Sequence, residues 1–175
     1  GLLVDPSPYP PVVPGPVNRI GVAPSRYRDV LYRSALEARV ARFLDMHFPV
    51  WLYESGPSLT GVESARTRDG LFYGYLLDAG RYRPDFWLPS VRTFVEVKGD
   101  MGCYTLRNPV ELARRAAPLG VQVAVATHGR GGRFDLYVAR GGELWPATLT
   151  RCPSCGARYF HAGGPTDCRA CGVVP

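Results

Sequence analysis

Apolar residues are scattered at the start of the chain and fall into regular patterns only after residue 24. Residues 1–24 are rich in proline, which excludes a helix and disfavours a central strand, so we predict an extended arm there. Between residues 28 and 47, apolar residues recur at helical spacing, which predicts a first helix. Glu37 lies within the apolar side of this helix and is expected to point inward. The alternative is a capping box of Ser34 and Glu37, with the helix starting at Ser34.

Beyond this helix, short apolar runs predict the strands of a mixed sheet. β-Branched and aromatic residues dominate most runs, whereas residues 121–126 form an unbroken apolar run typical of a buried central strand. The runs lie at residues 50–53, 71–77, 82–88, 93–98, 121–126 and 134–138, with a turn at 78–80. We predict a second helix over 109–117, with Asn108 as its N-cap and Pro109 at its first position. This order predicts an α/β fold in which helices flank a mixed sheet.

The fourth apolar run ends with two charged residues. Side chains two apart on a strand share a face, so Glu96 and Lys98 are expected to project together. Asp85, just before another apolar stretch, is a second acid that could reach the same site. Lys98 is the only lysine among 21 basic residues, and lysine, unlike arginine, can release its proton. Glu54, near another strand end, either supports this site or is solvated, and we favour solvation.

Carboxylates that share a small site need a positive charge between them, because they otherwise repel one another. If Asp85, Glu96 and Lys98 meet and Glu37 reaches the same place, a hard divalent cation with oxygen ligands, such as Mg²⁺, meets this need. Such a cation polarises a phosphoryl oxygen and lowers the pKa of its bound water. A nearby amine can assist the nucleophile or stabilise the developing charge. The residue set therefore predicts phosphodiester hydrolysis.

The spacing of these residues resembles that of the PD-(D/E)xK nuclease superfamily. Pro84-Asp85 is followed, after ten intervening residues, by Glu96-Val97-Lys98, and Glu37 lies in the helix upstream. The surrounding sequences are similar to those of a group of small PD-(D/E)xK proteins from high-GC bacteria and their phages. They are YRSALEAR at 32–39, YRPDFWLP at 82–89 and FVEVKG at 94–99. The resemblance spans roughly residues 28–127 and implies an αβββαβ core with a mixed sheet.

The resemblance also implies a role for each residue of the pattern. Glu37, Asp85, Glu96 and the main-chain carbonyl of Val97 would hold catalytic Mg²⁺ or Mn²⁺, and Lys98 would be the catalytic lysine. Two simpler interpretations stay open. Glu96 and Lys98 could form a surface ion pair on an edge strand, and Asp85 could serve only to start a turn after proline.

Four of the five cysteines form two CxxC pairs near the C-terminus, each followed by glycine. Cys152 and Cys155 form the first pair, and Cys168 and Cys171 form the second. Two such turns can present four thiolates to one Zn²⁺ ion, so we predict a structural zinc site that resembles a zinc ribbon. His161, between the pairs, could replace one ligand. A disulfide pair is the alternative, which the lack of a visible secretory signal disfavours.

The chain has a formal net charge of +6, carried almost entirely by arginine, which favours a polyanionic partner. A GC-rich genome is the other explanation of the arginine content. We predict that the partner is DNA. The candidate DNA contacts are Arg66 and Arg68 in a predicted loop, and Arg151, Arg158 and Arg169 around the cysteines. No apolar run reaches the length of about 18 residues that a membrane helix needs, so we expect no membrane association.

These features together predict three segments and one leading function. The segments are an arm at 1–24, a nuclease-like domain at 25–148 and a zinc ribbon at 149–175. The expected function is that of a metal-dependent DNA endonuclease, cytoplasmic in a bacterium or a phage-infected host. The alternatives are a nucleic-acid-binding module that does not cleave and a zinc-ribbon adaptor for a protein partner. The sequence leaves open which DNA structure is cut and whether the chain forms a homodimer.

Overall fold

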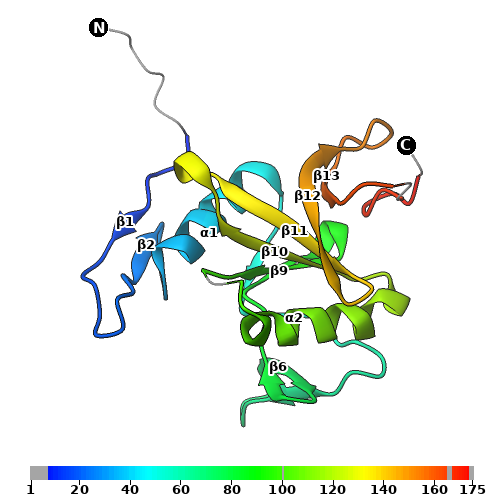
Figure 1. Cartoon of the computed structure of the whole chain (residues 1–175), viewed down its shortest axis with the longest axis horizontal. Coiled ribbons are helices and arrows are strands. Elements are labelled where there is room, and N and C mark those ends of the chain that lie inside the picture. The colour runs from blue at the N-terminus through cyan, green and yellow to red at the C-terminus, as the bar shows by residue number, and fades with distance from the viewer. Residues whose placement is uncertain (1–7, 100, 165–166, 174–175) are drawn as a thin grey trace, which may run out of the picture. The chain divides into compact units, whose positions relative to one another are not determined.

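A computed structural model of the chain describes residues 8–99, 101–164 and 167–173 (Figure 1). The chain divides into two compact units, the first up to His47 and the second from Phe48 onward. Residues 1–7 of the predicted arm lie outside the described residues. In the part of the chain that the structure describes, no helix is long and apolar enough to cross a membrane.

The first unit consists of a small antiparallel sheet and one helix. The strands pair in the order β1-β2-β3. The bounds are β1 Val13–Pro14, β2 Ser25–Tyr27, β3 Val30–Tyr32 and α1 Ala35–His47. The hydroxyl of the buried Tyr27 donates a hydrogen bond to the carboxylate of Asp45 at 2.7 Å. This bond ties β2 to α1.

The predicted helix over 28–47 is wrong at its start. Strand β3 lies in that region, and α1 begins only at Ala35. The hydroxyl of Ser34 accepts a hydrogen bond from the N–H of Glu37 at 3.1 Å, which is an N-cap contact. This bond confirms the alternative in one respect: Ser34 caps the helix through its hydroxyl. Tyr32, within the predicted range, is buried, but its side chain is buried from strand β3 rather than from a helix.

The second unit is built on a seven-stranded mixed sheet, in the order β13-β12-β11-β10-β9-β8-β4. Strands β9 and β10 run parallel, and the other neighbouring pairs are antiparallel. The bounds are β4 Leu52–Tyr53, β8 Phe86–Leu88, β9 Thr93–Val97, β10 Gln122–His128, β11 Phe134–Arg140, β12 Glu143–Arg151 and β13 Arg158–His161. The prediction of an α/β fold with a mixed sheet is confirmed.

A smaller sheet and a helix cover one face of the main sheet. The smaller sheet has the order β5-β6-β7. The bounds are β5 Ser64–Arg66, β6 Phe72–Leu77, β7 Gly80–Tyr82 and α2 Cys103–Ala116, with short 3₁₀ helices at Pro89–Val91, Ala117–Leu119 and Arg130–Gly132. Tyr75 and Tyr82 of the smaller sheet share one buried core with Phe94 of β9 and Leu112 of α2. Figure 1 shows α2 against the main sheet, with the β6 sheet beside it.

Helix α2 begins earlier than the sequence predicts. It starts at Cys103, after Gly102 as N-cap, and it contains Pro109 in its interior. The predicted N-cap, Asn108, lies inside the helix instead, and its buried Oδ1 has no hydrogen-bond partner among the described residues. A proline inside a helix costs about 3 kcal/mol. Burial of the apolar face around Leu112 against the sheet offsets that cost.

Candidate active site and metal centre

The pairing of β8 with β9 brings Asp85 and Glu96 to the same edge of the main sheet. Because the two strands are antiparallel, the residue that precedes β8 lies beside the end of β9. The N–H of Val97 donates to Asp85 Oδ2 at 2.7 Å, and the N–H of Asp85 donates to Glu96 Oε2 at 3.3 Å. Both carboxylates are buried. The structure thus holds the two predicted acids next to each other through main-chain hydrogen bonds.

Lys98 pairs with Glu96 from the end of β9. Its Nζ lies 3.2 Å from Glu96 Oε1. The two side chains share one face of the strand, as their spacing predicts. The alternative of a surface ion pair on an edge strand is wrong, because β9 lies between β8 and β10 and Glu96 is only 5% exposed.

Tyr82 is a residue of this site that the sequence analysis missed. Its buried hydroxyl donates to Glu96 Oε2 at 2.5 Å. It belongs to β7 of the smaller sheet, which therefore supplies one wall of the site. The only signal for it in the sequence is a tyrosine three residues before Asp85, a pattern too short to assign a role.

Burial of Glu96 disfavours its ionised form. Burial raises the pKa of its carboxyl above the ordinary value, although the Lys98 ammonium and the Tyr82 hydroxyl both lower it. Burial also raises the pKa of Tyr82 well above its ordinary value, and the neighbouring Glu96 charge adds to this effect. Tyr82 therefore stays protonated and donates its hydrogen bond. Perturbed carboxyl groups of this kind gather at functional sites.

Glu54 fixes the main chain next to Asp85. It follows β4 at the same edge of the sheet, and its N–H donates to the carbonyl of Asp85 at 2.8 Å. Its carboxylate lies 2.8 Å from the guanidinium of Arg83. Its φ is +52°, a left-handed conformation that costs a non-glycine residue on the order of 1 kcal/mol. The interpretation of Glu54 as a solvated side chain is therefore wrong.

Glu37, the remaining predicted ligand, lies on α1 of the first unit. Its side chain is buried, as the helical pattern predicts, and Oε1 lies 3.7 Å from the guanidinium nitrogen of Arg33. The N-cap contact from Ser34 explains the position of its main chain. Its role at the Glu96 site, which belongs to the second unit, stays a prediction.

The four paired cysteines gather into one cluster. All of their sulfur atoms lie within 4.8 Å of one another. The sulfurs of Cys152 and Cys171 are 3.8 Å apart, and those of Cys155 and Cys168 are 3.7 Å apart. Four thiolates at about 2.3 Å from a tetrahedral Zn²⁺ ion would be roughly 3.8 Å apart, whereas a disulfide needs about 2.05 Å. The cluster could therefore hold a structural metal such as zinc.

Two turns with the same hydrogen bonds present these thiols. Gly156 N–H donates to the carbonyl of Cys152 at 2.9 Å, and Gly172 N–H donates to that of Cys168 at 2.8 Å. Both glycines have a φ of +75°, which explains why each CxxC pair is followed by glycine. The two CxxC turns therefore have the same main-chain hydrogen bonds and the same glycine conformation.

The two thiols of the first CxxC turn, Cys152 and Cys155, differ in acidity. Hydrogen bonds from main-chain N–H groups, that of Cys155 first, lower the pKa of Cys152 to about 6. The N–H of Ala157 lowers the pKa of Cys155, but burial and the neighbouring sulfurs outweigh it and raise that pKa to about 11. Four adjacent thiolates thus need a cation to hold their charge together.

The five arginines predicted to contact DNA do not form one patch. Arg66 lies on β5, where it donates to a main-chain carbonyl at 3.0 Å, and Arg68 is exposed in the turn that follows. Arg151 and Arg158 are opposite partners at the ends of β12 and β13, and Arg169 lies beside the cysteines. Figure 1 shows the β6 sheet and β13 at opposite ends of the second unit. Contact of these residues with DNA stays a prediction.

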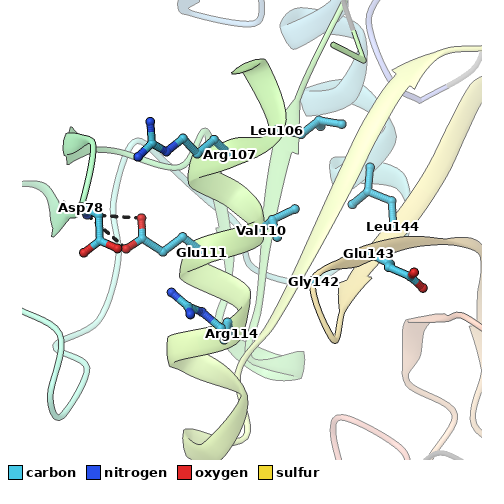
Figure 2. Close-up of a pocket in the computed structure, with 9 residues that line it drawn as sticks. All are labelled: Asp78, Leu106, Arg107, Val110, Glu111, Arg114, Gly142, Glu143 and Leu144. Carbon is cyan, nitrogen blue, oxygen red and sulfur yellow. Dashed lines mark hydrogen bonds between the residues drawn. The ribbon is translucent and has the colours of Figure 1, made fainter. Parts of the chain in front are cut away.

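A pocket of about 970 Å³ lies away from all of these residues, between α2 and the β11–β12 turn (Figure 2). Val110 of α2 and Leu144 of β12 face each other across it. Asp78 and Glu111 line another part of it, where Glu111 accepts a hydrogen bond from the N–H of Asp78 at 3.1 Å and pairs with Arg115 at 2.8 Å. These polar groups satisfy one another, so they connect α2 to the β6–β7 turn rather than form a site.

Comparison with models of protein families, with curated proteins and with solved structures found no significant match to this chain.

Proposed function

We propose that the chain is a metal-dependent DNA endonuclease that hydrolyses phosphodiester bonds at the Glu96 site. The observation that carries this proposal is a buried carboxylate paired with the chain's only lysine, with a second carboxylate held against it from the neighbouring strand. An arrangement needed only for stability would gain little from this pair, because a buried ion pair is often no better than apolar residues of the same size.

The donor set of the site fits a hard divalent cation such as Mg²⁺ or Mn²⁺. Asp85 and Glu96 offer carboxylate oxygens, and Glu37 and the carbonyl of Val97 are the further ligands in this proposal. A cation beside Glu96 would offset the cost of keeping its buried carboxyl ionised. When bound, it would polarise the phosphoryl oxygen and stabilise the leaving oxygen.

The protein side chains would position the substrate and the water. The ammonium of Lys98 would stabilise the charge that develops on the phosphoryl oxygens and orient the attacking water. Tyr82 and the N–H of Asp85 both bind Glu96 Oε2, so they fix the direction of that carboxylate. The N–H of Val97 fixes Asp85 in the same way.

The order of strands around the Glu96 site is a further reason for the proposal. Strands β4, β8 and β9 are antiparallel neighbours, and α2 then connects β9 to the parallel strand β10. The resemblance implies an αβββαβ core, and its identification with these elements is part of the proposal. The smaller β5–β7 sheet is an insertion between β4 and β8, and it contributes Tyr82.

The test of the proposed function is cleavage of supercoiled plasmid DNA with Mg²⁺ or Mn²⁺ and with EDTA. We expect the wild-type chain to nick or linearise the plasmid only in the presence of the metal. Asp85→Asn and Lys98→Gln should each lower the rate at least about 100-fold, because each removes a charge that acts on the transition state.

The matched control is Asp69→Asn, which removes the same charge from an exposed turn. It should cleave as the wild type does, and the thermal midpoints of all three variants should be compared with that of the wild type. Cleavage by the Asp85 and Lys98 variants at the wild-type rate would show that the site is assigned wrongly. DNA binding without any metal-dependent cleavage would favour the non-cleaving binding module.

A further inference from the structure

Tyr73 of the smaller sheet is turned out of the regular strand pattern. Tyr75, on the same strand β6, is fully buried, and a residue two positions away on a strand normally shares its face. Tyr73 is nevertheless 40% exposed. The register explains this, because Gly74 and Phe72 pair with successive residues of β5 and leave Tyr73, between them, as the extra residue of a β-bulge. Bulges redirect side chains and are common beside active sites.

Gly74 is required for this bulge. Its φ is +128°, a conformation that residues with a side chain rarely adopt. A Cβ at this position would lie 2.7 Å from the carbonyl oxygen of Tyr82 on the neighbouring strand, so a larger residue would force the main chain to shift. The sequence Tyr73-Gly74-Tyr75 therefore buries one tyrosine in the core and presents the other on the outer face of the smaller sheet.

Arg81 of β7 stacks on the exposed ring of Tyr73. Its guanidinium carbon lies 3.6 Å from the centre of the ring, and its Nη1 donates to the main-chain carbonyl of Tyr73 at 2.8 Å. Arg81 is itself exposed. The ring and the main chain thus hold a planar, positively charged group at the surface. We call these two residues the Tyr73–Arg81 stack.

A chain of contacts connects the Tyr73–Arg81 stack to the Glu96 site. The guanidinium of Arg83 lies 5.2 Å from the centre of the Tyr73 ring and 2.8 Å from the carboxylate of Glu54. The N–H of Glu54 in turn donates to the carbonyl of Asp85 at 2.8 Å. The stack therefore lies beside the main chain that carries one of the proposed metal ligands.

A flat cation stacked on an aromatic ring is suited to bind a nucleobase. Unpaired bases stack on aromatic rings and on the guanidinium planes of arginine, largely regardless of which base is present. Leu76, the strand partner of Arg81, adds a side chain that is 38% exposed to the same face. An anion alone would use the charge of Arg81, whereas a base would also use the flat and apolar surface around it.

We propose that the Tyr73–Arg81 stack binds an unpaired nucleobase beside the phosphodiester bond that is cleaved at the Glu96 site, an inference that rests on the proposed function. The substrate is then a nucleic acid with at least one unpaired nucleotide next to the cut, such as a single strand or the single-stranded extension of a duplex. A continuous duplex lacks this contact, because its bases are stacked on one another.

The test measures binding without cleavage, by fluorescence anisotropy of a labelled oligothymidylate of about 15 nucleotides in EDTA. We expect Arg81→Lys to raise the Kd about tenfold, because lysine keeps the charge but has no planar group on which a base can stack. The slope of log K against log salt should stay unchanged, since loss of one phosphate contact would lower its magnitude by about 0.7. Tyr73→Leu removes the ring beneath the guanidinium and should raise the Kd to a similar extent.

The matched control is Arg107→Lys, the same substitution at an exposed position of α2. It should keep the wild-type Kd. An equal loss of affinity in Arg107→Lys and Arg81→Lys would overturn the proposal, and so would wild-type affinity in Arg81→Lys.

A second arm uses only the wild-type chain, with a strand of the same length built of abasic nucleotides. This strand keeps the backbone charge but has no bases, so it should bind about tenfold more weakly than oligothymidylate. Equal binding of the two strands would overturn the proposal. An unlabelled duplex of the same length that competes as well as oligothymidylate would overturn the assignment to unpaired bases.

Two outcomes separate this inference from the proposed function. If oligothymidylate binding depends on Tyr73 and Arg81 but the wild type never cleaves DNA with Mg²⁺ or Mn²⁺, the endonuclease proposal fails and the base-binding inference stands. If the wild type cleaves plasmid only with the metal but binds the abasic strand as tightly as oligothymidylate, the endonuclease proposal stands and the base-binding inference is overturned.

Discussion

At the scale of single residues, the ionisation of Glu96 is set by a balance between burial and three donors. Burial favours its neutral form, whereas Lys98, Tyr82 and the N–H of Asp85 favour its charged form. The charged form is the one that could bind a divalent cation. The hydroxyl of Tyr82 therefore favours the ionised form of Glu96, and its removal should change the pKa of Glu96 in a predictable direction.

Replacement of Tyr82 by phenylalanine should raise the pKa of Glu96 further. The variant loses a hydrogen bond that lowers this pKa, while burial continues to raise it. The titration of the Glu96 carboxyl carbon, followed by NMR, should shift to higher pH, and the acidic limb of the cleavage rate should move in the same direction. Tyr75→Phe is the matched control, because Tyr75 is also buried but donates to the carbonyl of Pro57 at 2.6 Å. An equal shift in both variants, or none in Tyr82→Phe, would contradict the prediction.

At the scale of elements, the smaller sheet has to be held in place for Tyr82 to reach Glu96. The β6–β7 turn is tied to α2 by Glu111, whose buried carboxylate accepts two hydrogen bonds from the N–H of Asp78, at 3.1 and 3.3 Å. Arg115 binds Asp78 and Glu111, each at 2.8 Å. Helix α2 thus connects the smaller sheet to the main sheet through a polar contact as well as through the shared core.

Replacement of Glu111 by alanine should lower the free energy of unfolding by about 2 kcal/mol, because it leaves the main-chain N–H of Asp78 without its acceptor. Urea denaturation followed by circular dichroism measures the change. Glu143→Ala is the control. Glu143 is an exposed acid that lines the same pocket between α2 and the β11–β12 turn as Glu111 does (Figure 2). Its effect should stay within about 0.5 kcal/mol. A loss of similar size in both variants would remove the special role assigned to Glu111.

Elements defined by local pattern could be predicted from the sequence, and elements defined by distant contacts could not. The strand before Lys98, the buried run at 121–126 and the turn at 78–80 are all present, because spacing and turn chemistry are local signals. Pro109 indicated a helix start, but tertiary burial carries α2 across it. Tyr82 could not be assigned because its partner comes from another sheet.

At the scale of the whole molecule, the cysteine cluster is continuous with the main sheet. The predicted boundary between nuclease-like domain and zinc ribbon, at residue 149, falls inside β12, and β13 pairs with the end of that strand. Phe160 of β13 is buried, its ring lies 5.7 Å from that of Phe48, and its carbonyl accepts a hydrogen bond from Gln122 of β10 at 3.3 Å. Loss of a metal from the cluster should therefore affect the second unit as a whole.

Metal analysis of the purified chain should find about one zinc ion per chain, and its removal should lower the thermal midpoint in one cooperative transition. A loss of about 3 kcal/mol would correspond to a decrease of roughly 10 °C for a chain of this size. Cys155→Ser should reproduce the effect of the chelator, whereas Cys103→Ser, outside the two CxxC pairs, should bind zinc normally. Scanning calorimetry distinguishes a cysteine segment that unfolds together with the main sheet from one that unfolds independently. An unchanged main transition with a new, separate one at lower temperature would mean that the cysteine segment unfolds independently, which the continuous sheet argues against.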